Sequence, residues 1–157
     1  MKKQKEERTK EIMVSPEQER LAKVVLDAAF EVHSYLGPGL LENTYQICLL
    51  GELKERGIFA ETEKPLPVIY KGIYIDCAYR IDILVERDKI LIENKSVKEI
   101  KDIHMAQILS YLRLSGISLG FLFNFNVRSF KDGIRRIVLN DKKISSTPWV
   151  KKSPGQE

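Results

Sequence analysis

The feature that most constrains the fold is a β-hairpin pattern between Ile81 and Lys95, in which two apolar runs flank a short charged segment. A two-residue turn at Arg87-Asp88 places Asp82 opposite Glu93. Side chains alternate between the two faces of a strand, so Lys95 shares a face with Glu93. The sequence therefore predicts two carboxylates and an amine on one patch of a sheet.

Two interpretations of this patch stand. In the first, Glu93 and Lys95 are solvated residues on a half-exposed strand. In the second, the strand is central, as the neighbouring Leu91, Ile92 and Val97 indicate, and its charges need compensation. A divalent cation compensates clustered carboxylates, and oxygen ligands with open positions suit Mg²⁺ or Mn²⁺.

The composition sets wide bounds. The chain has 157 residues, enough for one domain with its own core, and its 43% hydrophobic and 31% charged content is ordinary for a globular protein. The formal net charge of +4 permits an anionic partner without requiring one. Cys48 and Cys77 lie in apolar surroundings and are interpreted as buried thiols in a reducing compartment. No apolar run suits a membrane span or a signal peptide, so the expected location is the cytoplasm.

The chain divides into a charged mobile arm (residues 1–13), a single domain (14–140) and a loosely held polar tail (141–157). Ser15, Pro16 and Gln18 form a helix-start signature, and Gly37 ends that helix. The remaining pattern predicts a helix over about 40–56, strands at 67–70, 73–77, around Asp82 and around Glu93, a helix over about 101–115, and strands at 118–125 and 134–139. This order favours an α/β fold, a mixed central sheet flanked by helices, with two helices before the sheet.

The order αβββαβ, with Asp82 on one strand and Glu93-Asn94-Lys95 on the next, resembles the PD-(D/E)xK nuclease superfamily, whose core is restriction-endonuclease-like. Within it, the chain is similar to the GxxExxY family, because Gly39, Glu42 and Tyr45 have that spacing. The resemblance extends over roughly residues 17–140.

The resemblance implies roles for individual residues. Asp82 and Glu93 would be the main metal ligands, with Glu42 completing the site from the helix before the sheet. Lys95 would be the catalytic lysine. Gln107 and Tyr111 match a Gln-x-x-x-Tyr motif of recombination-helicase nuclease domains, where both polar residues line the cleft, and residues four apart share a helix face.

Two residues depart from the family pattern. The middle of the Glu-x-Lys triplet is usually apolar, and here it is Asn94, which is expected to point away from the metal toward a packed helix. Ile81 stands where a proline often precedes the first aspartate.

Several of these residues have simpler explanations. Glu42 in a first helical turn is favoured by the helix dipole alone. Tyr45 is expected to be a core residue, and His33 a hydrogen-bonded structural histidine. His104 begins a helix, and Gln107 and Tyr111 are ordinary helix residues without the resemblance. The basic cluster of Arg128, Lys131, Arg135 and Arg136 is most often a solvated face, although such residues also contact phosphates.

The expected function is a Mg²⁺- or Mn²⁺-dependent nuclease that hydrolyses phosphodiester bonds, acting on DNA with a preference for structure or ends. The alternative is a non-catalytic nuclease-like module that binds nucleic acid or a protein partner. A toxin, defence or mobile-element protein acting on DNA also fits the residues. A homodimer is an open possibility.

Overall fold

The computed structural model describes residues 14–139. The charged arm (1–13) and the polar tail (141–157) predicted from the sequence lie outside the described residues. Helices and strands follow one another as α2 (Pro16–Leu36), α3 (Glu42–Glu55), β1 (Ala60–Pro65), β2 (Val68–Tyr70), β3 (Ile73–Ile75), β4 (Arg80–Val85), β5 (Ile90–Lys95), α4 (Asp102–Ser115), β6 (Leu119–Asn124), the 3-10 turn η1 (Phe130–Gly133) and β7 (Ile134–Val138).

Helix α2 begins where its sequence signature predicts. The Ser15 hydroxyl accepts the N–H of Gln18, and the Gln18 side chain accepts the N–H of Ser15, which completes a capping box. The Gln18 amide also donates to the carbonyl of Lys89 and to the hydroxyl of Ser118, at 2.8 and 2.9 Å. The capping residue thereby also fastens the start of the helix to the sheet.

The central sheet has five strands in the order β1-β4-β5-β6-β7. Strands β5 and β6 are parallel and are joined through α4, and the other neighbours in the sheet are antiparallel. Because β5 lies between β4 and β6, the predicted central position of the Glu93 strand is confirmed. The series α3, β1, β4, β5, α4, β6 is the expected αβββαβ core, so the predicted mixed α/β fold with two preceding helices is confirmed.

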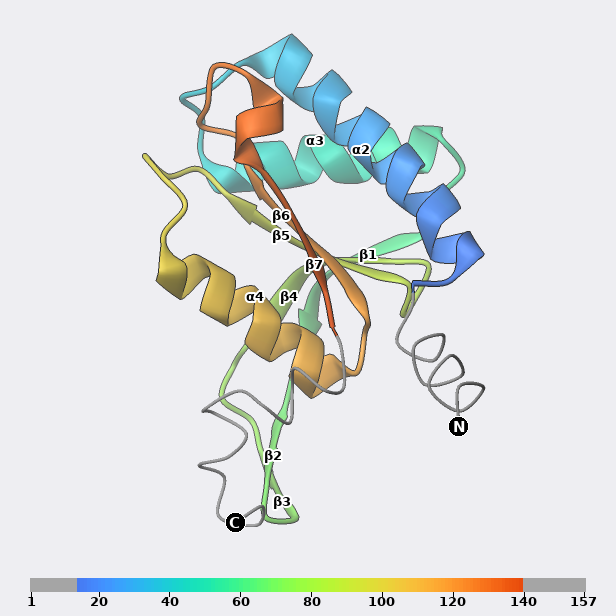
Figure 1. The fold of residues 1–157 in the computed structure, drawn as a ribbon, viewed down its shortest axis with the longest axis vertical. Coiled ribbons are helices and arrows are strands. Elements are labelled where there is room, and N and C mark those ends of the chain that lie inside the picture. Colours follow the sequence, from blue (N-terminus) through green and yellow to red (C-terminus); the bar gives the residue numbers. More distant parts are fainter. Residues whose placement is uncertain (1–13, 140–157) are drawn as a thin grey trace, which may run out of the picture.

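Helices cover both faces of this sheet (Figure 1). Helices α2 and α3 pack on one face through a cluster that includes Val25, Tyr45, Leu49 and the sheet residues Ile83 and Ile92. On the opposite face, α4 packs through Ile108 and Leu112 against a second cluster, to which β4 and β5 contribute Leu84 and Leu91. The alternation of β4 and β5 residues between the clusters assigns each side chain of this hairpin to a face.

Strands β2 and β3 form a separate two-stranded sheet that projects from the body of the molecule (Figure 1). Lys71 and Gly72 link them, and both have positive φ angles of 48° and 80°. Two consecutive positive φ angles are typical of the tight turn that matches the twist of a hairpin. At the base of the projection, the N–H of Leu66 donates to the carbonyl of Tyr79 at 3.0 Å.

Three sequence expectations needed correction. Strand β1 was not predicted, because half of its residues are charged and it pairs only with β4, at an edge of the sheet. Charged side chains are common on the edge strands of a sheet, because an edge strand is open to solvent on one side. The strand expected over 73–77 ends at Ile75, since the Asp76 carboxylate accepts the N–H of Ala78, whose φ is 60°. Cys77 lies beyond this strand end and is exposed. Cys48, on α3, is half-buried, so the interpretation of both cysteines as buried thiols was wrong.

Candidate functional site

The sheet opens at Asp82 and Glu93. The β4–β5 pairing runs from Val85↔Ile90 to Ile83↔Ile92, so the next positions outward are Asp82 and Glu93, which is the predicted register. The predicted two-residue turn at Arg87-Asp88 was wrong: the strands are joined by the four residues 86–89, and the register is kept because this loop also has an even number of residues. Beyond them, β4 continues against β1 and β5 continues against β6. The two strands therefore diverge at the carboxylates, and we call this opening the fork.

At the fork, side chains take the place of the backbone ladder. The N–H of Asn94 donates to Oδ2 of Asp82 at 2.8 Å, and the N–H of Asp82 donates to Oε1 of Glu93 at 3.3 Å. Each carboxylate thus satisfies a backbone donor of the opposite strand, which holds the two acids against one another. The residues two positions away, Leu84 and Leu91, face α4, so Asp82 and Glu93 also face α4.

Burial makes this arrangement electrostatically unfavourable while both acids are ionised. Glu93 is only 3% exposed. Its burial, followed by the charge of Asp82, raises the pKa of Glu93 from 4.5 to about 8. Burial also raises the pKa of Asp82 from 3.8 to about 6, with a further contribution from the charge of Glu63. The pair therefore favours either protons or a cation.

Lys95 continues the same face of β5 and contacts α4. Its Nζ donates to Oε1 of Gln107 at 3.0 Å, and the Gln107 amide donates to the hydroxyl of Tyr111 at 3.3 Å. The charge of Lys95 lowers the pKa of both carboxyls, but within residues 14–139 it forms no ion pair with either one. Burial raises the pKa of Tyr111, and the charges of Glu93 and Asp82 contribute to that rise. A chain of hydrogen-bonded side chains thus runs from Lys95 through Gln107 to Tyr111 along α4.

Glu42 is less closely associated with this site. It is the first residue of α3 and its side chain is exposed. Its charge raises the pKa of both Asp82 and Glu93, so it lies within electrostatic range of the fork. Among the described residues, however, no three of the His, Cys, Asp and Glu side chains are grouped closely enough to hold a metal ion.

Glu63 is the acidic neighbour that sequence reasoning missed. It lies on β1 opposite Asp82, between the pairs Thr62↔Ile83 and Lys64↔Ile81, and has a φ of 52°. Its Oε2 accepts a hydrogen bond from the Gln46 amide at 2.9 Å. The negative charge of Glu63 raises the pKa of Asp82 more than the charge of Glu42 does. No motif marks it, because β1 itself has no strand pattern in the sequence.

The corner before α3 is fixed to the end of β5. The Tyr45 hydroxyl donates to the carbonyl of Gly37 at 2.6 Å and accepts the N–H of Leu40 at 3.1 Å. The Ser96 hydroxyl donates to the carbonyl of Leu40 at 2.6 Å. Tyr45 itself is fully buried and stacks on Phe125, as expected for a core residue. These bonds fix where α3 begins, and therefore where Glu42 lies.

Asn94 points away from the carboxylates. Strand alternation places it on the α2–α3 face, where it is 1% exposed and its amide has no hydrogen-bond partner within the described part of the chain. An unpaired buried amide costs about 1–3 kcal/mol, which is the packing defect expected for a polar residue at this position.

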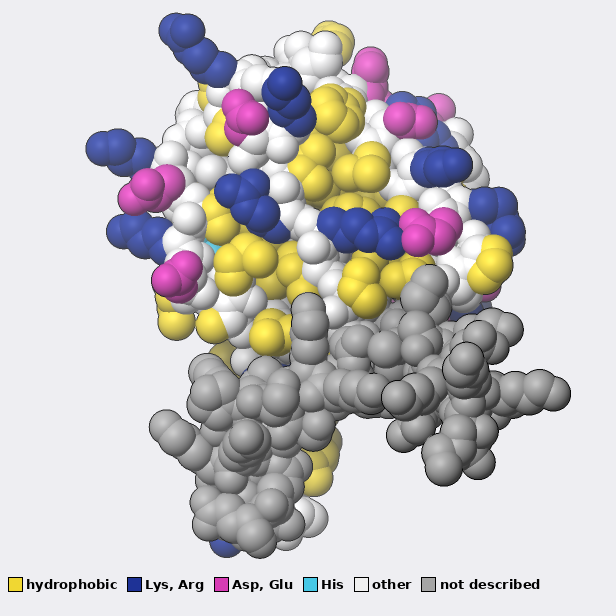
Figure 2. Space-filling view, viewed as in Figure 1, with side chains coloured by type: hydrophobic (Ala, Val, Ile, Leu, Met, Phe, Trp, Pro, Cys, Tyr) yellow, Lys and Arg dark blue, Asp and Glu magenta, His cyan; other side chains and the backbone are white. Residues whose placement is uncertain are grey.

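Other candidates have structural roles. The His33 ring contacts the carbonyl of Val127 at 2.7 Å, and Nδ1 of His104 accepts the N–H of Lys101 at 2.9 Å. In the basic cluster, Arg135 donates to the carbonyl of Asp132 and Arg136 pairs with Glu19. Figure 2 shows basic and acidic side chains interspersed over one face of the molecule, not a single basic patch.

No helix of residues 14–139 is long and apolar enough to cross a membrane. Comparisons with curated proteins and with solved structures gave no match. The sequence model of the PD-(D/E)XK nuclease superfamily matches residues 19–137, which include the fork and Lys95 together with Gln107 and Tyr111. This match covers most of the chain, and the chain therefore belongs to the PD-(D/E)XK nuclease superfamily.

Proposed function

We propose that this protein is a divalent-metal-dependent nuclease of the GxxExxY branch, which hydrolyses phosphodiester bonds in DNA. The observation that carries the proposal is the carboxylate pair at the fork, in which Glu93 is buried and Asp82 half-buried, with Lys95 on the same face of β5. Membership of a nuclease superfamily supports the reaction class. The spacing of Gly39, Glu42 and Tyr45 supports the branch.

The donor set fits Mg²⁺ or Mn²⁺. Asp82 uses Oδ2 and Glu93 uses Oε1 to accept backbone N–H groups, and within the described residues no hydrogen bond is formed by Oδ1 of Asp82 or Oε2 of Glu93. These two carboxylate oxygens are therefore available to bind a cation. The raised pKa values of both carboxyls mean that a bound positive charge would stabilise their ionised forms. We assign Asp82 and Glu93 as metal ligands and Glu42 as a third acid that acts from the exposed side. A divalent cation bound here supplies Lewis acidity to a phosphate and lowers the pKa of a water molecule.

Lys95 is assigned the stabilisation of charge on the phosphate. In hydrolysis a water oxygen attacks phosphorus, negative charge builds up on the phosphate oxygens, and the departing oxygen takes a proton. An ammonium held beside these oxygens favours that charged arrangement over the starting phosphodiester. Gln107 orients the Lys95 amine, since its Oε1 accepts from Nζ, and Tyr111 holds Gln107 in turn. We assign both as residues that orient Lys95, water or phosphate.

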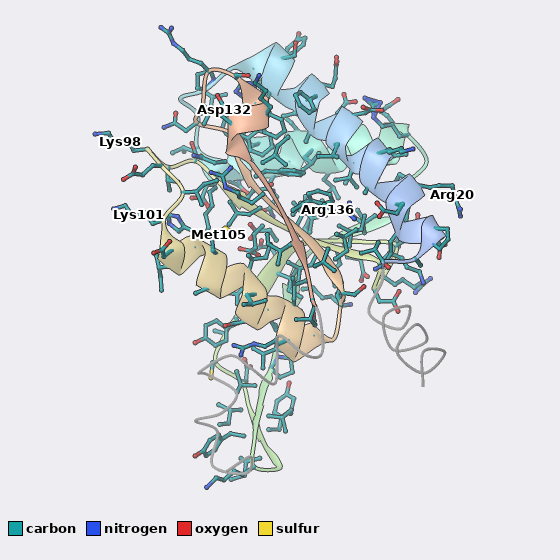
Figure 3. The ribbon with its side chains drawn as sticks, viewed as in Figure 1. Arg20, Lys98, Lys101, Met105, Asp132 and Arg136 are labelled. Atoms are coloured by element: carbon teal, nitrogen blue, oxygen red, sulfur yellow. The ribbon has the colours of Figure 1, made fainter. Side chains whose placement is uncertain are left out.

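Phosphates outside the scissile bond need further cations. Lys98 and Lys101 are exposed on the segment that leads from β5 to α4, and Figure 3 shows both extending outward from the same end of the molecule. Arg20 lies on α2 at the opposite end of the same view (Figure 3). We assign Lys98 and Lys101 to contacts with the DNA backbone, and Arg20, which carries the same charge as either lysine, is the control.

The setting of the protein is also proposed. Free thiols at Cys48 and Cys77 fit a reducing compartment, and we place the protein in the cytoplasm. Action as a homodimer stays a proposal that sedimentation can test.

A non-catalytic nuclease-like module is the second candidate. It is favoured by the lack of a three-ligand group among residues 14–139, since Glu42 does not close on the other two acids. Such a module would bind nucleic acid or a protein partner without cutting.

Cleavage of labelled DNA separates the two candidates. The purified chain, incubated with single-stranded, flapped and duplex DNA in Mg²⁺ or Mn²⁺, should cleave at least one substrate, and chelator should abolish cleavage. Lys98→Ala and Lys101→Ala should each raise the DNA concentration needed for half-maximal cleavage, and Arg20→Ala, which removes one charge as each of them does, should not. Binding without cleavage in either metal would favour the non-catalytic module.

A further inference from the structure

The β2–β3 hairpin carries an unusual amount of exposed apolar surface. Ile69, Tyr70, Ile73 and Tyr74 are 59, 46, 60 and 66% exposed. Three-residue strands in a two-stranded sheet gain little stability from burying such side chains, and none of these four residues belongs to either core cluster of the described chain. Large exposed apolar residues gathered on one projecting element indicate a binding surface.

The pairing of the hairpin distributes its rings evenly. Ile69 lies opposite Tyr74, and Tyr70 lies opposite Ile73, so each of these cross-strand pairs shares a face. Because neighbouring residues of a strand point to opposite faces, the two pairs lie on opposite faces of the hairpin. Each face therefore presents one tyrosine ring beside one of the two exposed isoleucines.

The tip of the hairpin is basic. The tight turn presents Lys71, whose Nζ lies 5.6 Å from the centre of the Tyr70 ring. Asp76 is the acidic residue of the segment 66–80, and its carboxylate accepts the N–H of Ala78 near the base of the hairpin. A hairpin with a cationic tip and a tyrosine ring on each face is suited to nucleic acid, whose phosphates are anionic and whose bases stack on aromatic rings.

The base of the hairpin reaches the proposed active site. Tyr79 packs against Tyr111 with ring centroids 6.0 Å apart, and Tyr111 accepts the hydrogen bond of Gln107 that leads to Lys95. Three residues beyond Tyr79, the same chain supplies Asp82. A strand of nucleic acid guided along one face of the hairpin would therefore arrive at the fork.

We propose that the β2–β3 hairpin is a wedge that enters nucleic acid where two paired strands separate, with Tyr70 and Tyr74 each stacking on a base of a different strand. The inference rests on the proposed function in one respect: one of the separated strands is delivered to the fork for cleavage. It names a duplex with unpaired arms as the class of substrate.

A second copy of the chain fits this surface less well. A second copy that paired its strand with an edge of the hairpin would gain a ladder of only three residues. A second copy that packed against one face of the hairpin would cover one tyrosine ring and leave the ring on the opposite face exposed. Separated strands of a forked duplex, in contrast, pass on both sides of a wedge.

Binding to two DNAs that share one duplex sequence, one of them extended by two non-complementary arms, tests the proposal. One is a blunt duplex and the other ends in two unpaired arms, and both are measured by fluorescence anisotropy in chelator, so that no cutting occurs. The native chain should bind the forked duplex about tenfold or more tightly than the blunt one, because stacking on a side chain is worth about that factor per base. Tyr70→Ala with Tyr74→Ala should remove the preference without changing the affinity for the blunt duplex.

Matched variants separate the rings from other effects. Tyr70→Phe with Tyr74→Phe keeps both rings and should keep the preference, and so should Tyr35→Ala, which removes an exposed tyrosine of α2. All the altered side chains are exposed, so thermal melts should coincide. The proposal is wrong if the native chain shows no preference for the forked duplex or if the double alanine variant retains it. It is also wrong if that variant changes the mass of the protein in sedimentation, which would assign the hairpin to a contact between copies.

The two proposals fail differently. Cleavage of single-stranded DNA in Mg²⁺ without a preference for the forked duplex would leave the nuclease standing and remove the wedge. A preference for the forked duplex in a chain that cleaves no DNA would leave the wedge standing and remove the nuclease.

Discussion

Lys95 carries the sharpest prediction at the scale of single residues. Lys95 shares a face of the sheet with the buried Glu93 and the half-buried Asp82, but its ammonium donates to Gln107 and forms no ion pair with either acid among residues 14–139. An ammonium is not a metal ligand, so Lys95→Ala should reduce DNA cleavage about 100-fold or more while Mn²⁺ binding in calorimetry stays as tight or becomes tighter.

The control for Lys95→Ala is Arg20→Ala, which removes one positive charge from an exposed position on α2. Its maximal cleavage rate should stay within a few-fold of the native rate. Equal loss of cleavage in both variants would mean that Lys95 contributes only to the overall positive charge of the protein and has no specific role at the phosphate.

Single residues also show what the sequence could specify. The register of Asp82 with Glu93 follows from strand alternation and an even number of loop residues, which are local regularities. The spacing of Gln107 and Tyr111 placed both on one helix face, but the hydrogen bond from Lys95 to Gln107 was not predicted. Glu63 could not be found in this way, because its influence on Asp82 arises from an edge strand whose pairing is set by tertiary structure. The corner bonds of Tyr45 and Ser96 are likewise contacts between distant segments.

At the scale of elements, Gly133 is the position where the turn η1 and strand β6 approach most closely. A Cβ at Gly133 would lie 2.0 Å from the carbonyl oxygen of Asn124, which is backbone and cannot rotate away. Gly133→Ala should therefore lower the free energy of unfolding by about 1–3 kcal/mol, measured by urea denaturation.

Gly51 provides the matched control within α3. A Cβ there meets nothing within 4 Å, so Gly51→Ala should raise the free energy of unfolding by about 0.5–1 kcal/mol through helix propensity alone. If the two alanine variants proved equally stable, the close approach of η1 to β6 would be incorrect.

The helices and strands that could be predicted are those whose own sequences have a periodic or capping pattern. Helix α2 has a capping box and a regular apolar stripe, and its bounds were anticipated at both ends. Strand β1 has charged residues at an edge, and η1 is one short turn, so neither has a periodic signal. The β2–β3 pair was expected as strands, but its separation from the main sheet depends on pairing that no local pattern encodes.

At the scale of the whole molecule, the carboxylate pair should make stability depend on pH. The folded-state pKa values, about 6 for Asp82 and about 8 for Glu93, are raised above the ordinary values of 3.8 and 4.5. The folded state thus binds more protons than the unfolded state between about pH 4 and 8, and the free energy of unfolding contributed by the pair falls as pH rises through that window.

Thermal melts in chelator can test this sign. At pH 8, Asp82→Asn should melt a few degrees above the native chain, because it removes repulsion yet keeps an oxygen that accepts the N–H of Asn94. At pH 4 the difference should vanish. A variant that melted below the native chain at pH 8 would instead make Asp82 a structural partner of Lys95.

The central claim is that Asp82 and Glu93 together hold a divalent cation. It is tested most directly by anomalous diffraction from crystals of the native chain and of Asp82→Asn, both soaked in Mn²⁺. We expect an anomalous peak between the two carboxylates in the native crystals and none in the variant. A native map with no peak at the fork, or with Lys95 closed onto Asp82 and Glu93 in place of the ion, would contradict the claim.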